Sequence, residues 1–324
     1  MLRRTLIAGV AASSLPLAAP AVHAQGFPSR PVQVVVGWPP GGGVDTMGRA
    51  LAAAMSAELG VPVVVDNRPG AAGVIATMAA ARAPADGYTL LFMSLSELAV
   101  RQAASRTEYD LDRDFLPISL TGVTPIVIAV NSSVPARTPT EFVAWVREQG
   151  GHANYGSPGI GTLQHFAGEA LRYGTDLRIE HIPYRGAAPA VTDLIGGSIQ
   201  IVSSGLPPLV GHVAGKRAHL IAASTARRTS VLPDLPTFSE AGWGEVDIAN
   251  YAGLAAPKGI PSHVLARLEA AAMAAAKHPR VAQVFASAGS EVIGSTSADY
   301  ARFIEVERAR QVELIRATKF VIEE

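Results

Sequence analysis

Two glycine-rich stretches decide the fold of this chain: residues 38–46, WPPGGGVDT, and residues 155–162, YGSPGIGT. Each follows a short strand-like run and precedes an amphipathic run with helical spacing, so each predicts a turn that opens a helix. Glycines leave backbone N–H groups uncovered, and a helix start adds unpaired donors at the positive end of the helix dipole. Such a turn binds an anion without a lysine or arginine. The pair therefore points to a small acid that is held from two sides.

Other interpretations of these turns stay open. Each turn alone is equally well explained as structural, because left-handed turns also need glycine. Neither has the spacing of a nucleotide-binding loop. Asp45 or Thr46 is placed to cap the first helix, and a capping aspartate would either compete with an anion or pair with a ligand ammonium group. His165 lies in the first turn of the second helix, where it either meets the anion or is a solvated or capping histidine.

The first 24 residues are predicted to be a signal peptide. Two arginines precede an apolar run over residues 6–19, and a small-x-small site ends at Ala24, so the mature chain is expected to begin at Gln25. The alternative, a membrane anchor, is disfavoured because the run is short and interrupted by prolines. The paired arginines leave open whether export uses the general or the twin-arginine route.

Composition narrows the classes of function. The chain has no cysteine, which excludes disulfides, thiolate metal sites and a thiol nucleophile. Lysine plus arginine and aspartate plus glutamate are 27 each, and loss of the leader leaves a net charge of −2. A near-neutral protein is a poor candidate for binding nucleic acid or a membrane surface. No catalytic or metal-binding motif is present, so we predict no catalytic residue, no metal and no cofactor.

Short apolar runs alternate with helical patterns, which indicates parallel sheets with crossover helices. The predicted strands are residues 32–36, 61–65, 88–93, 126–130, 154–156, 179–184, 199–202 and 220–223. The predicted helices are residues 47–59, 70–83, 138–148 and 163–171, one that opens at Pro261, and one that runs from Thr296 to about Lys319.

Taken together, the sequence resembles the solute-binding receptors of tripartite tricarboxylate transporters, the Bug-type receptors. The matching markers are residues 39–42 with Asp45, 62–70, 86–91, 114–115 with 117–118, 155–159 with 161–162, His165 with 167–169, 183–186, 196–197, 232–237 with 240–242, and 256–257. The resemblance implies a type II periplasmic-binding-protein fold, in which two α/β lobes are joined by two crossing strands with a ligand cleft between them. Residues 25–125 plus 250–324 are predicted to form lobe 1, and residues 126–249 to form lobe 2.

The resemblance also implies that backbone amides of the two turns bind a carboxylate. The predicted ligand-binding residues are Trp38, Pro40, Gly41, Gly42, Gly43, Asp45, Thr46, Ser94, Ser157, Gly159, Ile160, Gly161, Thr162, His165, Tyr184 and Ser204. This sequence departs from the family pattern at Gln200, at Ser203 and Ser204, and in residues 95–104, where an Asn-Pro pair is absent. These segments border the cleft in the family, so we expect an unusual acid with an aromatic or apolar body.

The resulting hypothesis is a periplasmic receptor that captures a small carboxylate and delivers it to the membrane permease subunits of a tripartite transporter. It is expected to bind no nucleic acid and not to insert into the membrane. Two alternatives remain: a sensor of the same fold that signals to a membrane kinase, and an exported α/β enzyme that acts on a carboxylate.

Overall fold

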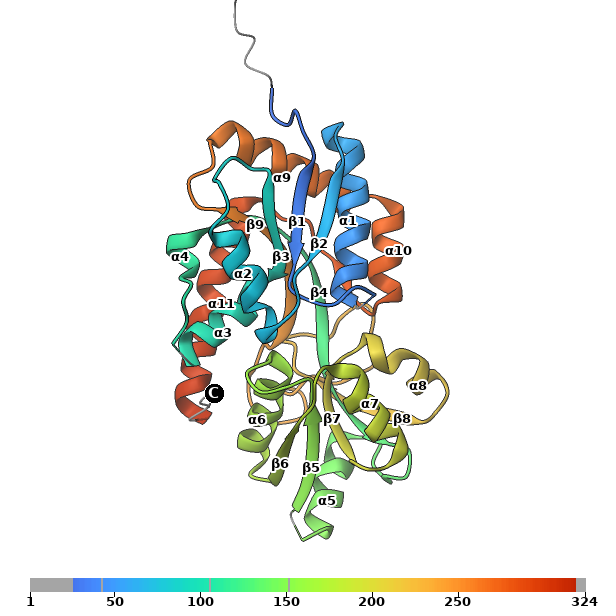
Figure 1. Ribbon diagram of the computed structural model, residues 1–324. Coiled ribbons are helices and arrows are strands. Elements are labelled where there is room, and N and C mark those ends of the chain that lie inside the picture. The colour runs from blue at the N-terminus through green and yellow to red at the C-terminus, as the bar shows by residue number, and fades with distance from the viewer. Residues whose placement is uncertain (1–25, 42, 105, 151, 319–324) are drawn as a thin grey trace, which may run out of the picture.

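The computed structural model describes residues 26–41, 43–104, 106–150 and 152–318. They form two α/β lobes, which lie one above the other in Figure 1, with strand β4 running from one into the other. The predicted signal peptide and Gly42 lie outside the described residues.

Lobe 1 contains a sheet in the order β2-β1-β3-β9-β4, in which β10 also pairs with β4. β1 pairs in parallel with β2 and β3, whereas β9 is antiparallel to both β3 and β4. The strands are β1 Val32–Val36, β2 Val63–Asn67, β3 Thr89–Ser94, β4 Phe115–Asn131, β9 Ala249–Pro257 and β10 Glu291–Val292. The helices are α1 Gly43–Leu59, η1 Ala71–Gly73, α2 Val74–Ala81, α3 Leu95–Ala104, α4 Leu111–Asp114, α9 Ser262–Ala276, α10 Pro279–Ser287 and α11 Ser297–Thr318.

Lobe 2 contains a second sheet, in which β4 lies between β8 and β7, and β5 and β6 follow β7. β5 pairs in parallel with β6 and β7, and β4 is antiparallel to β7 and β8. The strands are β5 His152–Ser157, β6 Arg178–Pro183, β7 Ile201–Gly205 and β8 Ala218–Ala223. The helices are α5 Pro139–Glu148, α6 Leu163–Thr175, α7 Ala187–Gly196, η2 Pro207–Leu209 and α8 Val210–Ala214.

β4 connects the two sheets because it changes its partners along its length. From Phe115 to Pro125 it pairs with β9, and from Ile126 onward it pairs with β7. The prediction of a strand over residues 126–130 found only its second half. The first half carries Pro117 and Gly122, which weaken a strand pattern, and the register shifts beside both of them.

The helices bury one face each against the sheets. α1 buries Met47, Leu51, Met55 and Leu59, which recur every four residues and therefore lie on one side of the helix. They share a core with β1, β3 and β9 and with α9 and α10. A second core in lobe 2 surrounds Tyr155, Phe166 and Trp243. These cores fix the beginnings of α1 and α6, the two helices that the glycine-rich turns open.

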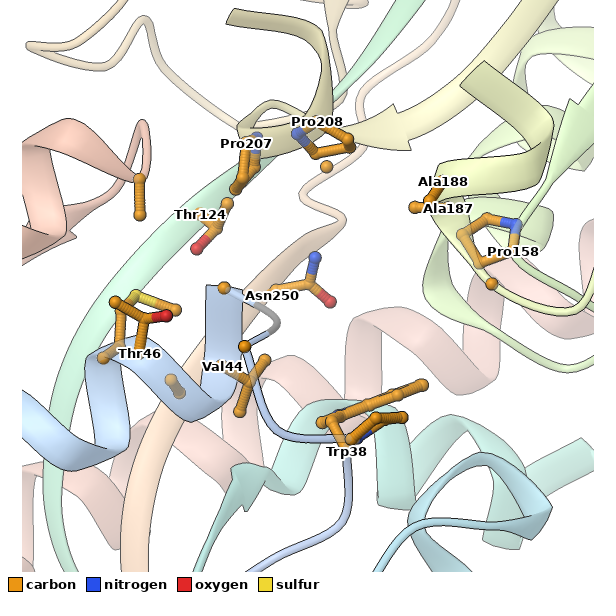
Figure 2. A pocket seen from close by; sticks show the side chains of 18 of the residues that line it. Trp38, Val44, Thr46, Thr124, Pro158, Ala187, Ala188, Pro207, Pro208 and Asn250 are labelled. Atoms are coloured by element: carbon orange, nitrogen blue, oxygen red, sulfur yellow. The ribbon is translucent and has the colours of Figure 1, made fainter. Parts of the chain in front are cut away.

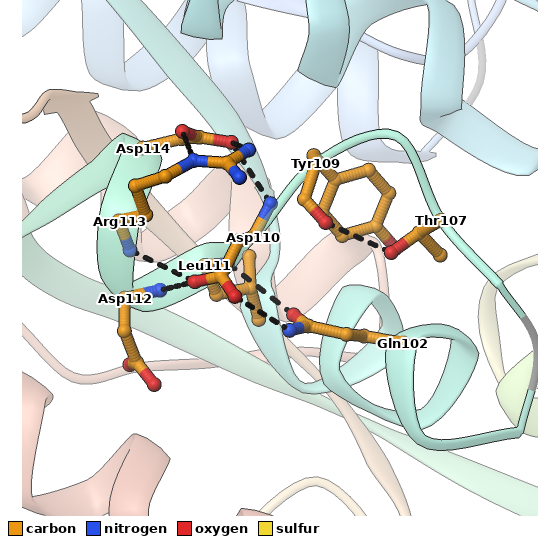
Figure 3. Close-up of polar contacts among 8 residues, drawn as sticks. All are labelled: Gln102, Thr107, Tyr109, Asp110, Leu111, Asp112, Arg113 and Asp114. Atoms are coloured by element: carbon orange, nitrogen blue, oxygen red, sulfur yellow. Dashed lines mark hydrogen bonds and ion pairs between the residues drawn. The ribbon is translucent and has the colours of Figure 1, made fainter.

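A network of hydrogen bonds ties α3 to the short helix α4 (Figure 3). The Asp110 carboxylate accepts hydrogen bonds from the backbone N–H groups of Asp112 and Arg113, and so caps α4. Gln102 in α3 accepts from the N–H of Leu111 at 3.2 Å and donates to Asp110. The last turn of α3 is thereby held against the beginning of α4.

Candidate ligand-binding site

A cleft of about 990 Å³ lies between the two lobes. Figure 2 shows its largely apolar wall, which Trp38 and Val44 line from lobe 1 and Pro158, Pro207 and Pro208 from lobe 2. Such a wall with few polar groups is typical of a small-molecule site.

Two strands beside the junction of the lobes supply polar groups to the cleft. Thr124 of β4 and Asn250 of β9 both line it. A hydroxyl and a carboxamide are therefore placed where the lobes join.

The first glycine-rich turn reaches the cleft through the beginning of α1. Gly41, Gly43, Val44 and Thr46 line the cleft. The first N–H groups of an α-helix have no acceptor within the helix, so those of α1 are available to an anion at this place. α1 has 17 residues, which gives its dipole the positive end that favours negative charge.

The buried Asp45 carboxylate holds this turn in place through hydrogen bonds. Its carboxylate accepts hydrogen bonds from the N–H of Gly41 at 2.9 Å, from Arg49 Nε at 3.0 Å and from Asn67 Nδ2 at 2.8 Å. Asn67 also donates to the carbonyl oxygen of Trp38 at 3.0 Å. Burial alone would raise the pKa of Asp45, but the hydrogen bonds from Arg49, Gly41 and Asn67 hold it below its ordinary value.

The prediction that Asp45 or Thr46 caps this helix is wrong. α1 already begins at Gly43, so both residues belong to its first turn. Asp45 instead reaches back to the N–H of Gly41, two residues before the helix begins. Thr46 is exposed and lines the cleft.

The N–H groups of the second glycine-rich turn donate mainly to side chains of the same turn and of the helix that follows it. Thr162 caps α6, because its side chain accepts the N–H of His165 at 3.2 Å. The N–H of Gly161 donates to His165 Nδ1 at 3.3 Å, and the N–H of Gly159 donates to Ser157 Oγ at 3.2 Å. From this stretch only Pro158 lines the cleft, and Gln164 of α6 does so beside it.

His165 and His181 form a buried stacked pair behind the second turn. Their ring centroids are 3.8 Å apart, and His181 Nε2 lies 2.6 Å from Ser157 Oγ. Burial lowers the pKa of His165 to about 4. Burial, and next the neighbouring His165, lower the pKa of His181 to about 4. Both rings are therefore neutral at neutral pH and act as hydrogen-bonding groups.

The structure brings some of the predicted ligand-binding residues to the cleft and places others elsewhere. Those that line it are Trp38, Gly41, Gly43, Thr46 and Ser94. Those outside its lining are Pro40, Asp45, Ser157, Gly159, Ile160, Gly161, Thr162, His165, Tyr184 and Ser204. Tyr184 donates to Asp193 at 2.8 Å, and Ser204 donates to the carbonyl of Gly205 at 3.0 Å.

Lobe 2 also reaches the cleft through the beginning of α7, which the sequence reasoning missed. Residues 185–189 line the cleft, and Gly186 precedes the helix without a side-chain cap. On the opposite wall, Arg280 and Gln283 of α10 line the cleft. The sequence signal at α7 is Arg185-Gly186, which forms part of a family marker but belongs to no anion-binding motif. α10 gave no signal, because it lies far along the chain and carries no motif.

Glu97 is a buried acid at the cleft that the sequence reasoning also missed. It lies in the first turn of α3, is 3% exposed, and lines the cleft beside Ser94. Its N–H donates to Ser94 Oγ at 3.3 Å. Burial raises the pKa of Glu97 to about 7, although Arg101 acts in the opposite direction.

The residues that the structure describes contain no group of three His, Asp or Glu side chains placed to hold a metal ion. Among these same residues, no helix has the length and apolar character that crossing a membrane requires.

Residues 47–320 match the family model described as "Tripartite tricarboxylate transporter family receptor". The chain belongs to this family. Protein BugT from Bordetella pertussis is 32% identical over 320 residues, which cover 98% of each chain. The receptor family and its two-lobe fold are therefore as the sequence predicts.

Two solved structures of similar proteins were determined with an acid. The structure described as R. palustris Rpa4515 with adipate is 29% identical, with a TM-score of 0.82 over 91% of this chain and 99% of that one. MatC from Rhodopseudomonas palustris with bound malate is 27% identical, with a TM-score of 0.78 over 89% of this chain and 100% of that one. Both likenesses support the type II periplasmic-binding-protein fold.

Proposed function

We propose that this receptor captures a small carboxylate between its two lobes in the periplasm and delivers it to the membrane permease subunits of a tripartite transporter. The observation that carries the proposal is the beginning of α1, which lines a largely apolar cleft between the lobes. Free N–H groups there suit a carboxylate, and the apolar wall suits the carbon chain of the ligand. The acids bound to two similar proteins, adipate and malate, belong to this chemical class.

Binding is proposed to close the lobes. Residues 25–125 plus 250–324 would move as lobe 1, and residues 126–249 as lobe 2. The support for these bounds is the exchange of partners in β4 between Pro125 and Ile126. A ligand that contacts both walls favours the closed arrangement by its differential affinity for it. We propose binding and release without chemical change to the ligand.

The test of the α1 site is one pair of variants at Val44. Val44→Pro removes one backbone N–H at a helix start that tolerates proline, and Val44→Ala keeps the N–H while shortening the same side chain. Loss of one hydrogen bond to a charged group should weaken carboxylate binding about tenfold or more in Val44→Pro relative to Val44→Ala. Calorimetry measures the affinities, and melting temperatures check that both variants fold. Equal affinities would show that this N–H does not touch the ligand.

The ligand test uses acids and their amides. A carboxylate that binds should lose most of its affinity when it is converted to the amide, because the amide NH₂ would face N–H donors. Added salt should matter little, since the donors are backbone groups close to the anion. Equal binding of an acid and its amide would contradict the proposal.

The proposed periplasmic location is tested by determining where the mature chain begins. Intact-mass measurement or N-terminal sequencing of periplasmic material should show a chain that begins near Gln25. A chain that keeps Met1 and sediments with membranes would contradict export.

A further inference from the structure

Glu97 brings a buried carboxyl group to the lining of the cleft. It is 3% exposed and lines the cleft, yet no hydrogen-bond donor within the described residues reaches its carboxyl group. Arg101, one turn further along α3, is close enough to influence it electrostatically. A carboxylate this deeply buried without donors from the protein is costly, because it has lost most of its water without gaining a hydrogen bond in exchange.

We propose that the Glu97 carboxylate is a second recognition point of the cleft, where it accepts a hydrogen bond from a hydroxyl or ammonium group of the bound acid. This inference rests on the proposed function and specifies it further. The ligand would be an acid that carries an O–H or N–H donor in addition to its carboxylate.

The other charges along the cleft favour a donor over a second carboxylate at this place. Glu97 is the one acidic side chain among the described residues that line the cleft, whereas Arg185 and Arg280 supply positive charge. Donors for ligand carboxylates are therefore available elsewhere, at the two arginines, at Asn250 and at the beginning of α1. A ligand carboxylate beside Glu97 would meet a like charge in a buried setting, which raises its free energy.

The position of Glu97 is well defined by its surroundings. Ser94 accepts the N–H of Glu97 at the beginning of α3, and Gln102 ties the end of the helix to Asp110 and Leu111 (Figure 3). A recognition group held from both ends of its helix loses little freedom when a ligand binds, so its hydrogen bond contributes fully to selectivity.

Binding of a donor should also be linked to pH. With its pKa raised to about 7, Glu97 is partly protonated in the free protein at neutral pH. A ligand donor stabilises the carboxylate form and lowers that pKa, so binding below pH 7 must release a proton. Affinity should therefore rise about tenfold from pH 6 to pH 8 and then level off.

The other titratable groups near α3 do not obscure the dependence of ligand affinity on pH. The phenols in the same core stay neutral, because burial raises the pKa of each: Tyr109, Tyr251 and Tyr300. On α11, which packs against α3, burial and next Asp247 raise the pKa of Glu307 to about 7. A variant at position 97 keeps Glu307, so any pH dependence that remains in that variant belongs to other groups.

The experiment compares three families of acids on wild-type protein and on Glu97→Gln. Each family holds a parent acid, its hydroxy acid and its amino acid: succinate, malate and aspartate; glutarate, 2-hydroxyglutarate and glutamate; 3-phenylpropanoate, phenyllactate and phenylalanine. Glu180→Gln is the matched control, since Glu180 is exposed on β6, away from the cleft lining. Calorimetry gives affinities at pH 6, 7 and 8, and melting curves without ligand check folding.

In at least one family the hydroxy or amino acid should bind wild type and Glu180→Gln about tenfold tighter than the parent acid. In Glu97→Gln that preference should fall to about twofold or less, and the rise in affinity with pH should disappear. Whether the hydroxy or the amino acid binds more tightly identifies the donor.

Parent acids that bind as tightly as their hydroxy and amino forms would overturn the role of Glu97 and leave the carboxylate receptor intact. A Glu97→Gln variant that keeps the preference would overturn that role in the same way. If Glu97→Gln fails to fold, the wild-type pH profile decides, because affinity that is flat or falling from pH 6 to 8 overturns the inference. If none of the acids binds, both this inference and the proposed carboxylate function fail.

Discussion

Replacing Asp45 by asparagine tests whether the first turn is held in place by a carboxylate. In the folded protein one oxygen, Oδ2, accepts from both the N–H of Gly41 and Arg49 Nε, and the other accepts from Asn67. Asparagine keeps the size and one acceptor of the side chain. Its NH₂ group, placed toward Asn67 or toward Gly41 and Arg49, meets donors in either case.

The expected loss follows from the burial of these contacts. The bond to the N–H of Gly41 involves a carboxylate that is 2% exposed, and such a bond contributes about 1.5–3 kcal/mol. The Arg49 side chain is 50% exposed, so its ion pair adds only about 0.5 kcal/mol. Asp45→Asn should therefore lower the free energy of unfolding by about 2–3.5 kcal/mol, and the melting temperature by about 3–6 °C. Carboxylate affinity should fall as well, because the turn loses the hydrogen bonds that hold it in position.

Chemical denaturation and thermal melting measure this loss. Glu108→Gln is the control, because its pair with Arg82 is largely exposed and should change stability by about 0.5 kcal/mol or less. The pKa of Asp45 is held low, so its stabilisation is present above pH 4 and is lost as the pH falls through the folded-state pKa. The gap between wild type and variant should stay constant from pH 5 to 8 and narrow below pH 4. A stability within about 0.5 kcal/mol of wild type at pH 7 would refute the reasoning.

Two further perturbations test lobe 2. Gly168→Ala should destabilise the protein by about 2 kcal/mol or more, because the added Cβ would lie 2.1 Å from the Tyr155 ring. Gly196→Ala is the control, because its Cβ would meet no atom within 4 Å and should leave the stability unchanged. Equal melting temperatures of the two variants would contradict the close packing of α6 on Tyr155. His165 and His181 are neutral when folded, so the free energy of unfolding should drop as the pH falls from about 6.5 toward 4, where only the unfolded chain gains protons. His181→Gln should flatten that slope in a denaturation series, and an unchanged slope would show that the pair does not titrate as described.

Local signals in the sequence predicted the elements that depend on local chemistry. β1 runs from Val32 to Val36 as predicted, because a continuous β-branched run has few alternatives. Thr138 caps α5 with the reciprocal bonds of a capping box. Thr296 and Asp299 likewise exchange hydrogen bonds at the beginning of α11.

The features that sequence reasoning missed depend on contacts between distant segments. The first half of β4 and all of β9 are strands because they pair with each other, and neither has a strong pattern of its own. Glu97 becomes notable only through its burial beside the cleft. The missing Asn-Pro pair marked its segment as unusual, but a lone glutamate in a helical pattern gives no sign of being buried.

The path of β4 has a consequence for how the chain folds. Residues 126–249 are continuous and carry every strand of the lobe 2 sheet, so lobe 2 can assemble from its own segment. The lobe 1 sheet is different, because β9 lies between β3 and β4 and comes at residues 249–257. As the chain emerges from a ribosome or a translocation pore, the edge of β3 that pairs with β9 stays unpaired until more than 150 further residues have emerged. We expect lobe 2 to fold first and the open edge of β3 to be the surface most in need of a chaperone until β9 arrives.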